Sequence, residues 1–197
     1  MKKILFVDFN GVLSYVPFWY SLKDPNHKLN KHFNDIENFL FKENVDLIKN
    51  WMLGKYSSEE INKIIADKLG ISYVLLFKAF KEDCEDMKVS DKILDKLASL
   101  KKEYYLILVT GNMDSFDRFT LPKEKKFLEV FDEIHNSYTF GKVKDSEYFK
   151  KVIIEKGISF DNCYLIDDHQ KTCNLFKELG CTAFCTKTEE EVLNIKL

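Results

Sequence analysis

Four short apolar runs, each ending in polar residues, most strongly limit how this chain can fold. They cover residues 4–7, 104–109, 163–166 and 182–185. Segments with helical periodicity precede the last three runs, and Ser90 and Ser146 stand where two of these segments begin. Buried strands that alternate with helices are typical of a parallel sheet with helices on both faces. We therefore predict an α/β fold with a Rossmann-like parallel sheet as its core.

Residues 15–89 interrupt this alternation with one helical pattern after another. Apolar residues recur at helical spacing, and Ser57 with Glu60 forms a capping box for a helix that ends at Gly70. A separate N-terminal helical domain would leave the strand at residues 4–7 without partners. We therefore expect an α/β core of residues 1–14 and 90–197, with residues 15–89 inserted as an all-α cap.

Polar side chains stand where the predicted strands end and where one helix begins. Asp8 and Thr110 end two strands, Asp167 and Asp168 end a third, and Lys144 directly precedes a predicted helix. Ligands of parallel sheets bind at the carboxyl ends of the strands. A nucleophile, a hydroxyl, an ammonium group and paired carboxylates fit one phosphate-handling site. Mg²⁺ held by the carboxylates would offset the repulsion between a carboxylate nucleophile and a phosphate.

Each of these residues also has an ordinary structural explanation. Asp167 and Asp168 can cap the helix that follows them, and Lys144 can be one solvated lysine among many. Cys181 and Cys185 have neither a second cysteine pair nor a nearby histidine, so we interpret them as buried thiols rather than zinc ligands. Five cysteines without close pairing favour a reducing cytoplasm over a disulfide-bonded protein.

Charge and hydropathy limit the partners of the chain. Its 30 Lys and Arg residues against 32 Asp and Glu give a net charge of −2, which excludes a protein that coats nucleic acid. The first apolar run ends at Asp8, too early for a signal sequence, and no stretch approaches the roughly 18 apolar residues of a membrane span. We expect a cytoplasmic protein without nucleic-acid or membrane partners, and its oligomeric state stays open.

The order of these motifs resembles that of the haloacid dehalogenase (HAD) superfamily over nearly the whole chain. The residues that carry the resemblance are Asp8-Phe9-Asn10-Gly11-Val12-Leu13 for motif I (D-x-D-G-x-L), Thr110 for motif II, Gly141-Lys142-Val143-Lys144 for motif III and Leu165-Ile166-Asp167-Asp168 for motif IV. The helical insertion between motifs I and II is similar to the C1-type cap of subfamily IA-like members.

The resemblance implies a phosphatase that acts on a small phosphorylated metabolite. Asp8 would attack phosphorus and form an aspartyl-phosphate. Thr110 and the amides of Gly111 and Asn112 would hold the phosphate oxygens. Lys144 would neutralise the nucleophile and the phosphoryl group, and Lys142 is a weaker alternative because it lacks a glycine three residues before it.

Mg²⁺ is the cofactor that the resemblance implies. Its ligands would be Asp8, the main-chain carbonyl of Asn10 and the carboxylates of motif IV. Asp168 aligns best with the direct ligand, whereas Asp167 would bind through water or fix Lys144 in place.

Asn10 departs from motif I, in which a second aspartate acts as general acid and base. An amide cannot carry a proton between steps, and such catalysis typically contributes about 10²–10⁴-fold. We predict metal and phosphate binding with slow turnover of alkyl phosphates, and smaller losses for acyl or aryl phosphates. Three explanations stay open: a slow or specialised hydrolase, a catalytically weak module that binds a phosphorylated ligand or a protein, and an engineered Asp→Asn replacement.

Dehalogenation is the other enzymatic hypothesis. The dehalogenases that the chain resembles use an arginine near the start of the cap and usually have an aromatic residue at the position of Asn10. Arg118, the only arginine of the chain, lies beyond motif II, so this reaction is disfavoured. The aromatic segment at residues 15–20 could form a wall for an apolar or ring-bearing leaving group, although packing between cap and core is its more ordinary role.

Overall fold

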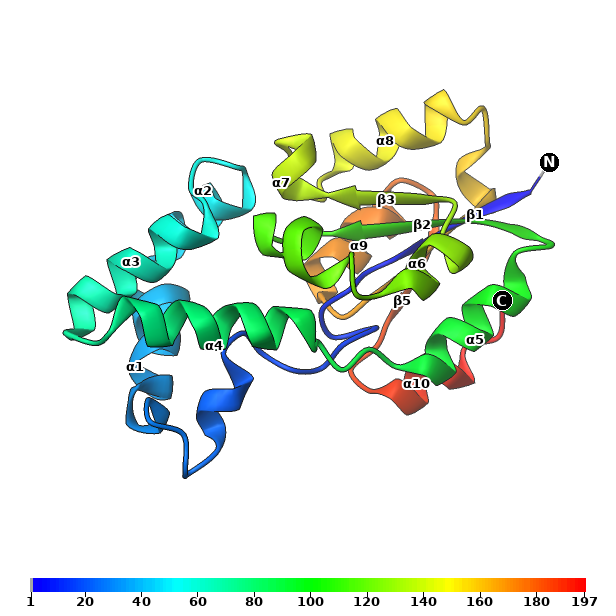
Figure 1. Cartoon of the computed structure of the whole chain (residues 1–197). Helices are drawn as coiled ribbons and strands as arrows, with labels where there is room; N and C mark the ends of the chain where they lie inside the picture. Colours follow the sequence, from blue (N-terminus) through cyan, green and yellow to red (C-terminus); the bar gives the residue numbers. More distant parts are fainter. Residues whose placement is uncertain (1) are drawn as a thin grey trace.

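The computed structural model describes residues 2–197 and contains one five-stranded parallel sheet. The strand order is β3-β2-β1-β4-β5. The strands are β1 (Lys3–Val7), β2 (Tyr104–Thr110), β3 (Glu133–Asn136), β4 (Cys163–Asp167) and β5 (Thr182–Cys185). The predicted α/β class and the parallel sheet are confirmed (Figure 1).

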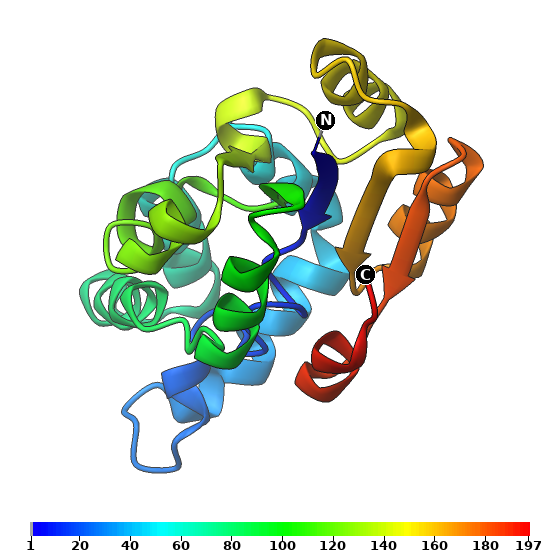
Figure 2. The ribbon, with the colours of Figure 1, turned by 90° about the vertical axis from the view of Figure 1, so that its right-hand side faces the viewer.

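Helices cover both faces of this sheet (Figures 1 and 2). Side chains of successive strand residues point to opposite faces, so Leu5 and Val7 join one apolar cluster while Ile4 and Phe6 join another. The first face packs against α5 (Asp91–Leu100), α6 (Lys125–Val130) and α10 (Glu189–Asn194), and the second against α8 (Ser146–Glu155) and α9 (Gln170–Glu178). Three short elements, η4 (Phe116–Thr120), α7 (Ser137–Phe140) and η5 (Phe160–Asn162), complete the core.

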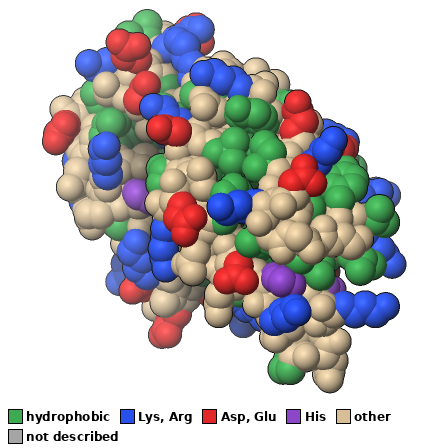
Figure 3. All heavy atoms as spheres, turned by 90° about the vertical axis from the view of Figure 1, so that its left-hand side faces the viewer, with side chains coloured by type: hydrophobic (Ala, Val, Ile, Leu, Met, Phe, Trp, Pro, Cys, Tyr) green, Lys and Arg blue, Asp and Glu red, His purple; other side chains and the backbone are tan. Residues whose placement is uncertain are grey.

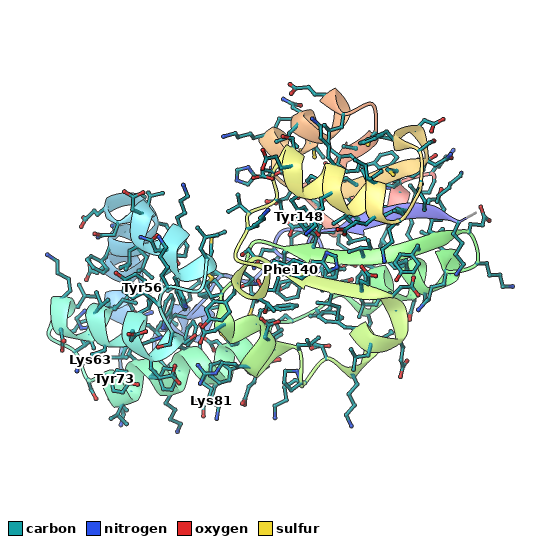
Figure 4. All side chains as sticks on the ribbon, turned by 90° about the horizontal axis from the view of Figure 1, so that it is seen from above. Tyr56, Lys63, Tyr73, Lys81, Phe140 and Tyr148 are labelled. Carbon is teal, nitrogen blue, oxygen red and sulfur yellow. The ribbon has the colours of Figure 1, made fainter. Side chains whose placement is uncertain are left out.

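Between β1 and α5 the chain forms a helical block beside the sheet. Its elements are η1 (Tyr20–Lys23), η2 (Asn30–His32), α1 (Phe33–Asn38), η3 (Phe39–Glu43), α2 (Val45–Met52), α3 (Ser58–Leu69) and α4 (Tyr73–Glu85). The predicted capping box is present, because Ser57 and Glu60 bond each other's main-chain amides at the start of α3. Figure 4 shows Tyr56 and Tyr73 within the block, whereas Phe140 and Tyr148 lie on the side of the sheet.

The block has an apolar cluster of its own, which includes the fully buried Trp19, Trp51 and Phe80. Met113 and Phe119, from the segment after β2, join the same cluster, so the block packs against the core. The chain leaves and re-enters the core at neighbouring points, where the Ser90 amide donates to the Leu13 carbonyl at 2.9 Å. The division at residues 14/15 and 89/90 stays a prediction.

Strand β3 was missed by the sequence analysis, which finds only four strands. Its sequence, Glu-Ile-His-Asn, is short and polar because it lies at the edge of the sheet, where most of its side chains stay partly exposed. The Glu133 carboxylate accepts a hydrogen bond from the Tyr105 hydroxyl at 2.9 Å and pairs with Lys156. Apolar patterning therefore carries no signal for this strand.

The surface of the helical block mixes apolar patches with lysine and acidic side chains (Figure 3). Among residues 2–197, no helix has both the length and the apolarity needed to cross a bilayer. All five cysteines are free thiols, and four of them are buried. The cytoplasmic location stays a prediction.

Candidate active site

The order of the strands brings three predicted site residues together at the carboxyl ends of neighbouring strands. Strand β1 lies between β2 and β4, so Asp8, Thr110 and Asp167 end neighbouring strands. The chain runs from β1 to β2 and β3 on one side and then crosses to β4 and β5 on the other, and ligands of such sheets bind in the crevice at this reversal. A cavity of about 390 Å³ lies here, and six predicted residues line it: Asp8, Asn10, Thr110, Gly111, Lys144 and Asp168.

Lys144 links two of the carboxylates. Its Nζ lies 2.7 Å from Asp8 Oδ2 and 2.8 Å from Asp167 Oδ2. It stands immediately before α8, whose first turn is capped by Asp145 accepting the Tyr148 amide at 2.8 Å. Lys142, the weaker alternative, lines other cavities and not this one.

Burial acts on the pKa values of Asp8 and Lys144 in opposite directions. It raises the pKa of Asp8 to about 7, the ammonium of Lys144 opposes the rise and the charge of Asp167 adds to it. Burial lowers the pKa of Lys144, but Asp8 and Asp167 outweigh this effect and hold it above its usual value. Two carboxylates, those of Asp8 and Asp167, therefore share one ammonium group in a poorly solvated place.

The carboxylates of Asp8, Asp167 and Asp168 form a cluster whose ligand atoms all lie within 4.8 Å of one another. The oxygens of Asp167 are already engaged, Oδ2 by Lys144 and Oδ1 by the His169 amide at 2.8 Å. Asp168 instead lines the cavity. Hard oxygen ligands and an excess of negative charge fit Mg²⁺, and Asp8 and Asp168 are the two carboxylates of the cluster that line the cavity.

Gly11 gives Asp168 the room to reach this cluster. A Cβ atom at Gly11 would lie 2.6 Å from both Cγ and Oδ2 of Asp168, closer than such atoms approach in proteins. The backbone of Gly11 also has a φ of +75°, a conformation that side-chain-bearing residues rarely adopt. The glycine of motif I therefore serves both the turn and the position of the carboxylate.

Thr110 offers an unused hydroxyl to the same cavity. The residue is 1% exposed, and its Oγ1 has no hydrogen-bond partner among the described residues. A buried hydroxyl without a partner is costly, so a ligand oxygen here would satisfy it.

Comparisons with known proteins agree with this architecture. No protein-family profile matches the chain, and no curated protein matches it in sequence. Among solved structures, a HAD family enzyme from Bacteroides thetaiotaomicron matches with a TM-score of 0.76 and 20% identity over 99% of each chain. A predicted HAD-like family hydrolase from Porphyromonas gingivalis matches with a TM-score of 0.71 and 20% identity over 100% of each chain. This chain has the HAD fold.

Two further matches bear on the chemistry of the HAD fold. A complex of the Bacteroides thetaiotaomicron enzyme with magnesium and inorganic phosphate matches with a TM-score of 0.69 and 21% identity over 93% of each chain. An L-2-haloacid dehalogenase from Xanthobacter autotrophicus matches with a TM-score of 0.64 and 11% identity over 93% of this chain and 76% of its own. The same fold therefore occurs in an enzyme solved with magnesium and inorganic phosphate and in a haloacid dehalogenase.

Within the HAD fold, the side chains of Asn10 and Asn112 are hydrogen-bonded to each other. The Asn112 side-chain amide donates to Asn10 Oδ1 at 3.1 Å, and the Asn112 main-chain amide donates to Asn136 Oδ1 at 3.2 Å. Asn112 is not among the residues that line the cavity, so its predicted contact with phosphate oxygens stays a prediction. Gly111 lines the cavity and remains placed for that contact.

Arg118, the single arginine, is not among the residues that line this cavity. Arg118 donates from two nitrogens to the two oxygens of Glu59, at 2.8 and 2.6 Å, and from Nη1 to Asp114 at 2.7 Å. Glu59 belongs to α3, so Arg118 ties the helical block to the core.

Met52 is a cavity residue that the sequence analysis missed. It ends α2 in the helical block, and its Cε lies 3.0 Å from the position that a Cβ of Gly111 would take. Periodicity marks such a methionine only as part of an apolar helix face, because nothing in the sequence shows which core residue the face meets. Val143, Thr172 and His169 also line the cavity.

Proposed function

We propose that this protein is a Mg²⁺-dependent hydrolase of phosphate monoesters that acts on a small phosphorylated metabolite through Asp8. The observation that carries the proposal is the contact of Asp8 with Lys144, at 2.7 Å, beside the Asp167 and Asp168 carboxylates. A HAD family enzyme of similar fold in complex with magnesium and inorganic phosphate supports it.

The proposed reaction has two displacements at phosphorus. A carboxylate oxygen of Asp8 attacks, the bond from phosphorus to the ester oxygen breaks, and the organic part leaves with that oxygen. Water then attacks the aspartyl-phosphate, which restores the Asp8 carboxylate and releases inorganic phosphate. Lys144, the Thr110 hydroxyl and the Gly111 amide would balance and hold the phosphoryl oxygens. Mg²⁺ bound by Asp8, the Asn10 carbonyl and Asp168 would supply further charge neutralisation.

Asn10 is the residue that we expect to slow the hydrolysis of phosphate esters. Its amide cannot donate a proton to the leaving oxygen or take one from the attacking water, and its Oδ1 is occupied by Asn112. Alkyl leaving groups need that proton most, because their alkoxides are strong bases. We therefore expect slow hydrolysis of alkyl phosphates and faster hydrolysis of aryl or acyl phosphates.

The Asn10→Asp variant tests this proposal against a panel of phosphate esters with Mg²⁺ present. We expect turnover of alkyl phosphates to rise by about 10²–10⁴-fold, and that of aryl phosphates to rise less. The exposed Asn34→Asp variant on α1 is a matched control without effect. An Asn10→Asp variant that gains no activity on any ester would show that Asn10 does not limit catalysis.

The fixed amide of Asn10 also favours a second candidate, a catalytically weak module that binds a phosphorylated ligand or protein. Such a module would bind phosphate compounds with Mg²⁺, yet neither the natural chain nor its Asn10→Asp variant would release phosphate. Dehalogenation stays disfavoured because Arg118 pairs with Glu59 and Asp114. Release of chloride or fluoride from a haloacid would reverse that view.

A further inference from the structure

The cavity lined by Asp8 and Lys144 is called the catalytic cavity below. A second cavity, of about 360 Å³, opens beside it. Asn10, Met52 and Gly111 line both cavities, so the two share a boundary. The helical block supplies the rest of the second cavity together with Met113, which follows β2. A phosphate ester with its phosphorus at Asp8 can therefore extend its organic part past Asn10 and beneath the block.

The walls of the second cavity are apolar apart from one charge. Six of its lining residues are apolar: Pro17, Phe18, Phe41, Ile48, Met52 and Met113. Of the described residues that line it, Glu37 on α1 is the one charged residue, and none is a lysine, arginine or histidine. An organic group with a second anionic substituent would meet no countercharge there.

Glu37 is short of partners. Its Oε1 is buried and has no hydrogen-bond partner among residues 2–197, and none of their ion pairs includes this residue. Lys23 and Lys42 act on it only at longer range, and the Lys23 ammonium lies 5.0 Å from the ring centre of Phe33. Burial raises the pKa of Glu37 despite both lysines. A carboxylate oxygen in this state is costly unless a ligand pairs with it.

We propose that the second cavity binds the organic part of the phosphate ester, and that Glu37 recognises an ammonium group on that part. This inference rests on the proposed function and names its substrate class: phosphate esters of amino alcohols with an apolar skeleton. A primary ammonium group has three N–H donors for Glu37. The rings of Phe18 and Phe41 favour a cation at their faces, and the apolar walls favour the carbon skeleton.

Phosphonates test the recognition without any turnover, because their carbon–phosphorus bond is not hydrolysed. We would measure the binding of an aminoalkyl phosphonate by calorimetry with Mg²⁺ present. Two analogues replace the ammonium group with a methyl or a hydroxyl group. We expect the ammonium compound to bind roughly tenfold tighter than either analogue. Glu37→Gln should remove the preference, whereas Glu43→Gln, at an exposed carboxylate outside the cavity, should keep it.

Inorganic phosphate with Mg²⁺ separates the two proposals. Equal binding of phosphate by the natural chain and by Glu37→Gln, with the ammonium preference lost only in the variant, supports the inference. Phosphate binding without any ammonium preference, or with a preference that Glu37→Gln leaves intact, overturns the inference alone. Failure to bind phosphate or any phosphonate overturns the proposed function as well.

Discussion

The two cavities are similar in size, about 390 and 360 Å³, but they differ in whether their carboxylates have a cationic partner within the protein. In the catalytic cavity, Asp8 and Asp167 share the ammonium group of Lys144 within 2.8 Å. In the second cavity, Glu37 forms no ion pair with any residue of 2–197, and no lysine, arginine or histidine of that range lines the walls. The first site therefore has one cation of its own among three carboxylates, whereas the second has none and would need its countercharge from a ligand.

This difference follows from which part of the chain builds each cavity. The ends of β1, β2 and β4 bring the proposed catalytic groups together, and the parallel sheet fixes their positions. The helical block supplies Glu37 and most of the apolar walls of the second cavity. The core would thus carry the reaction, and the block would select the organic group.

Asp8→Asn should abolish the reaction. It removes the nucleophile and one partner of Lys144, so we expect phosphate release from an aryl phosphate to fall on the order of 10⁴-fold. Asp67→Asn, at an exposed position on α3, is the control and should leave the rate unchanged. Steady-state phosphate release measures both. A variant that keeps its rate within about tenfold of the natural chain would remove Asp8 from the mechanism.

Gly11→Ala should lower the affinity of the catalytic cavity for Mg²⁺ and leave the second cavity unchanged. The added Cβ would displace the Asp168 carboxylate, so we expect Mg²⁺ affinity to fall roughly 10–100-fold. Gly70→Ala, at the end of α3, is the matched control, since Gly70 has a φ of +63° but no atom within 4 Å of the added Cβ. It should lower the free energy of unfolding by about 1–2 kcal/mol and leave Mg²⁺ affinity unchanged. Equal Mg²⁺ affinities of the two variants would refute the steric role of Gly11.

Asp114→Asn should loosen the helical block from the core. Asp114 is 2% exposed and accepts hydrogen bonds from Trp51 Nε1 at 2.8 Å, Ser58 Oγ at 2.7 Å and Arg118 Nη1 at 2.7 Å. Loss of its charge should lower the free energy of unfolding by about 1.5–3 kcal/mol.

Chemical denaturation of Asp114→Asn and Glu59→Gln measures this effect. Glu59 lies at the exposed end of the same network, so its replacement should cost less than about 1 kcal/mol. If the catalytic cavity does not depend on how the helical block is attached, Asp114→Asn should leave Mg²⁺ affinity unchanged. A loss of Mg²⁺ affinity would show that the block also shapes the catalytic cavity.

Glu37→Gln should slightly stabilise the protein at neutral pH. Burial raises the folded-state pKa of Glu37 above its usual 4.5, so its deprotonation disfavours the folded state. This penalty is absent below the unfolded-state pKa and complete above the raised pKa. We expect the variant to melt about 1–2 °C higher at pH 7 and at the same temperature as the natural chain near pH 4. Destabilisation at pH 7 would mean that Glu37 has a stabilising partner.

The catalytic cavity could be largely predicted from the sequence. Asp8, Thr110 and Asp167 each follow an apolar run, and parallel strands end at a common edge. Lys144 could be placed near them only through its motif, because a lysine before a helix carries no signal of burial. The motif favours Lys144 over Lys142, and the short distances from Lys144 to Asp8 and Asp167 support that preference.

The second cavity and strand β3 could not be predicted. Glu37 lies on a short helix whose pattern identifies an apolar face but not the segments opposite it. Met52 and Asn112 have roles that depend on the packing of the block on the segment after β2. β3 escapes detection because its polar side chains are paired at the sheet edge. Each of these features arises from tertiary contacts rather than from local sequence.

Thermal denaturation with Mg²⁺ and beryllofluoride tests the central claim most directly, because this anion with Mg²⁺ mimics a phosphoryl group on an aspartate. If Asp8, Lys144 and the carboxylate cluster form a phosphate-handling site, the two ions together should raise the melting temperature of the natural chain by several degrees, about 2–4 °C per kcal/mol of binding free energy. The rise should need both ions and should vanish in Asp8→Asn. An unchanged melting temperature in the natural chain would contradict the account.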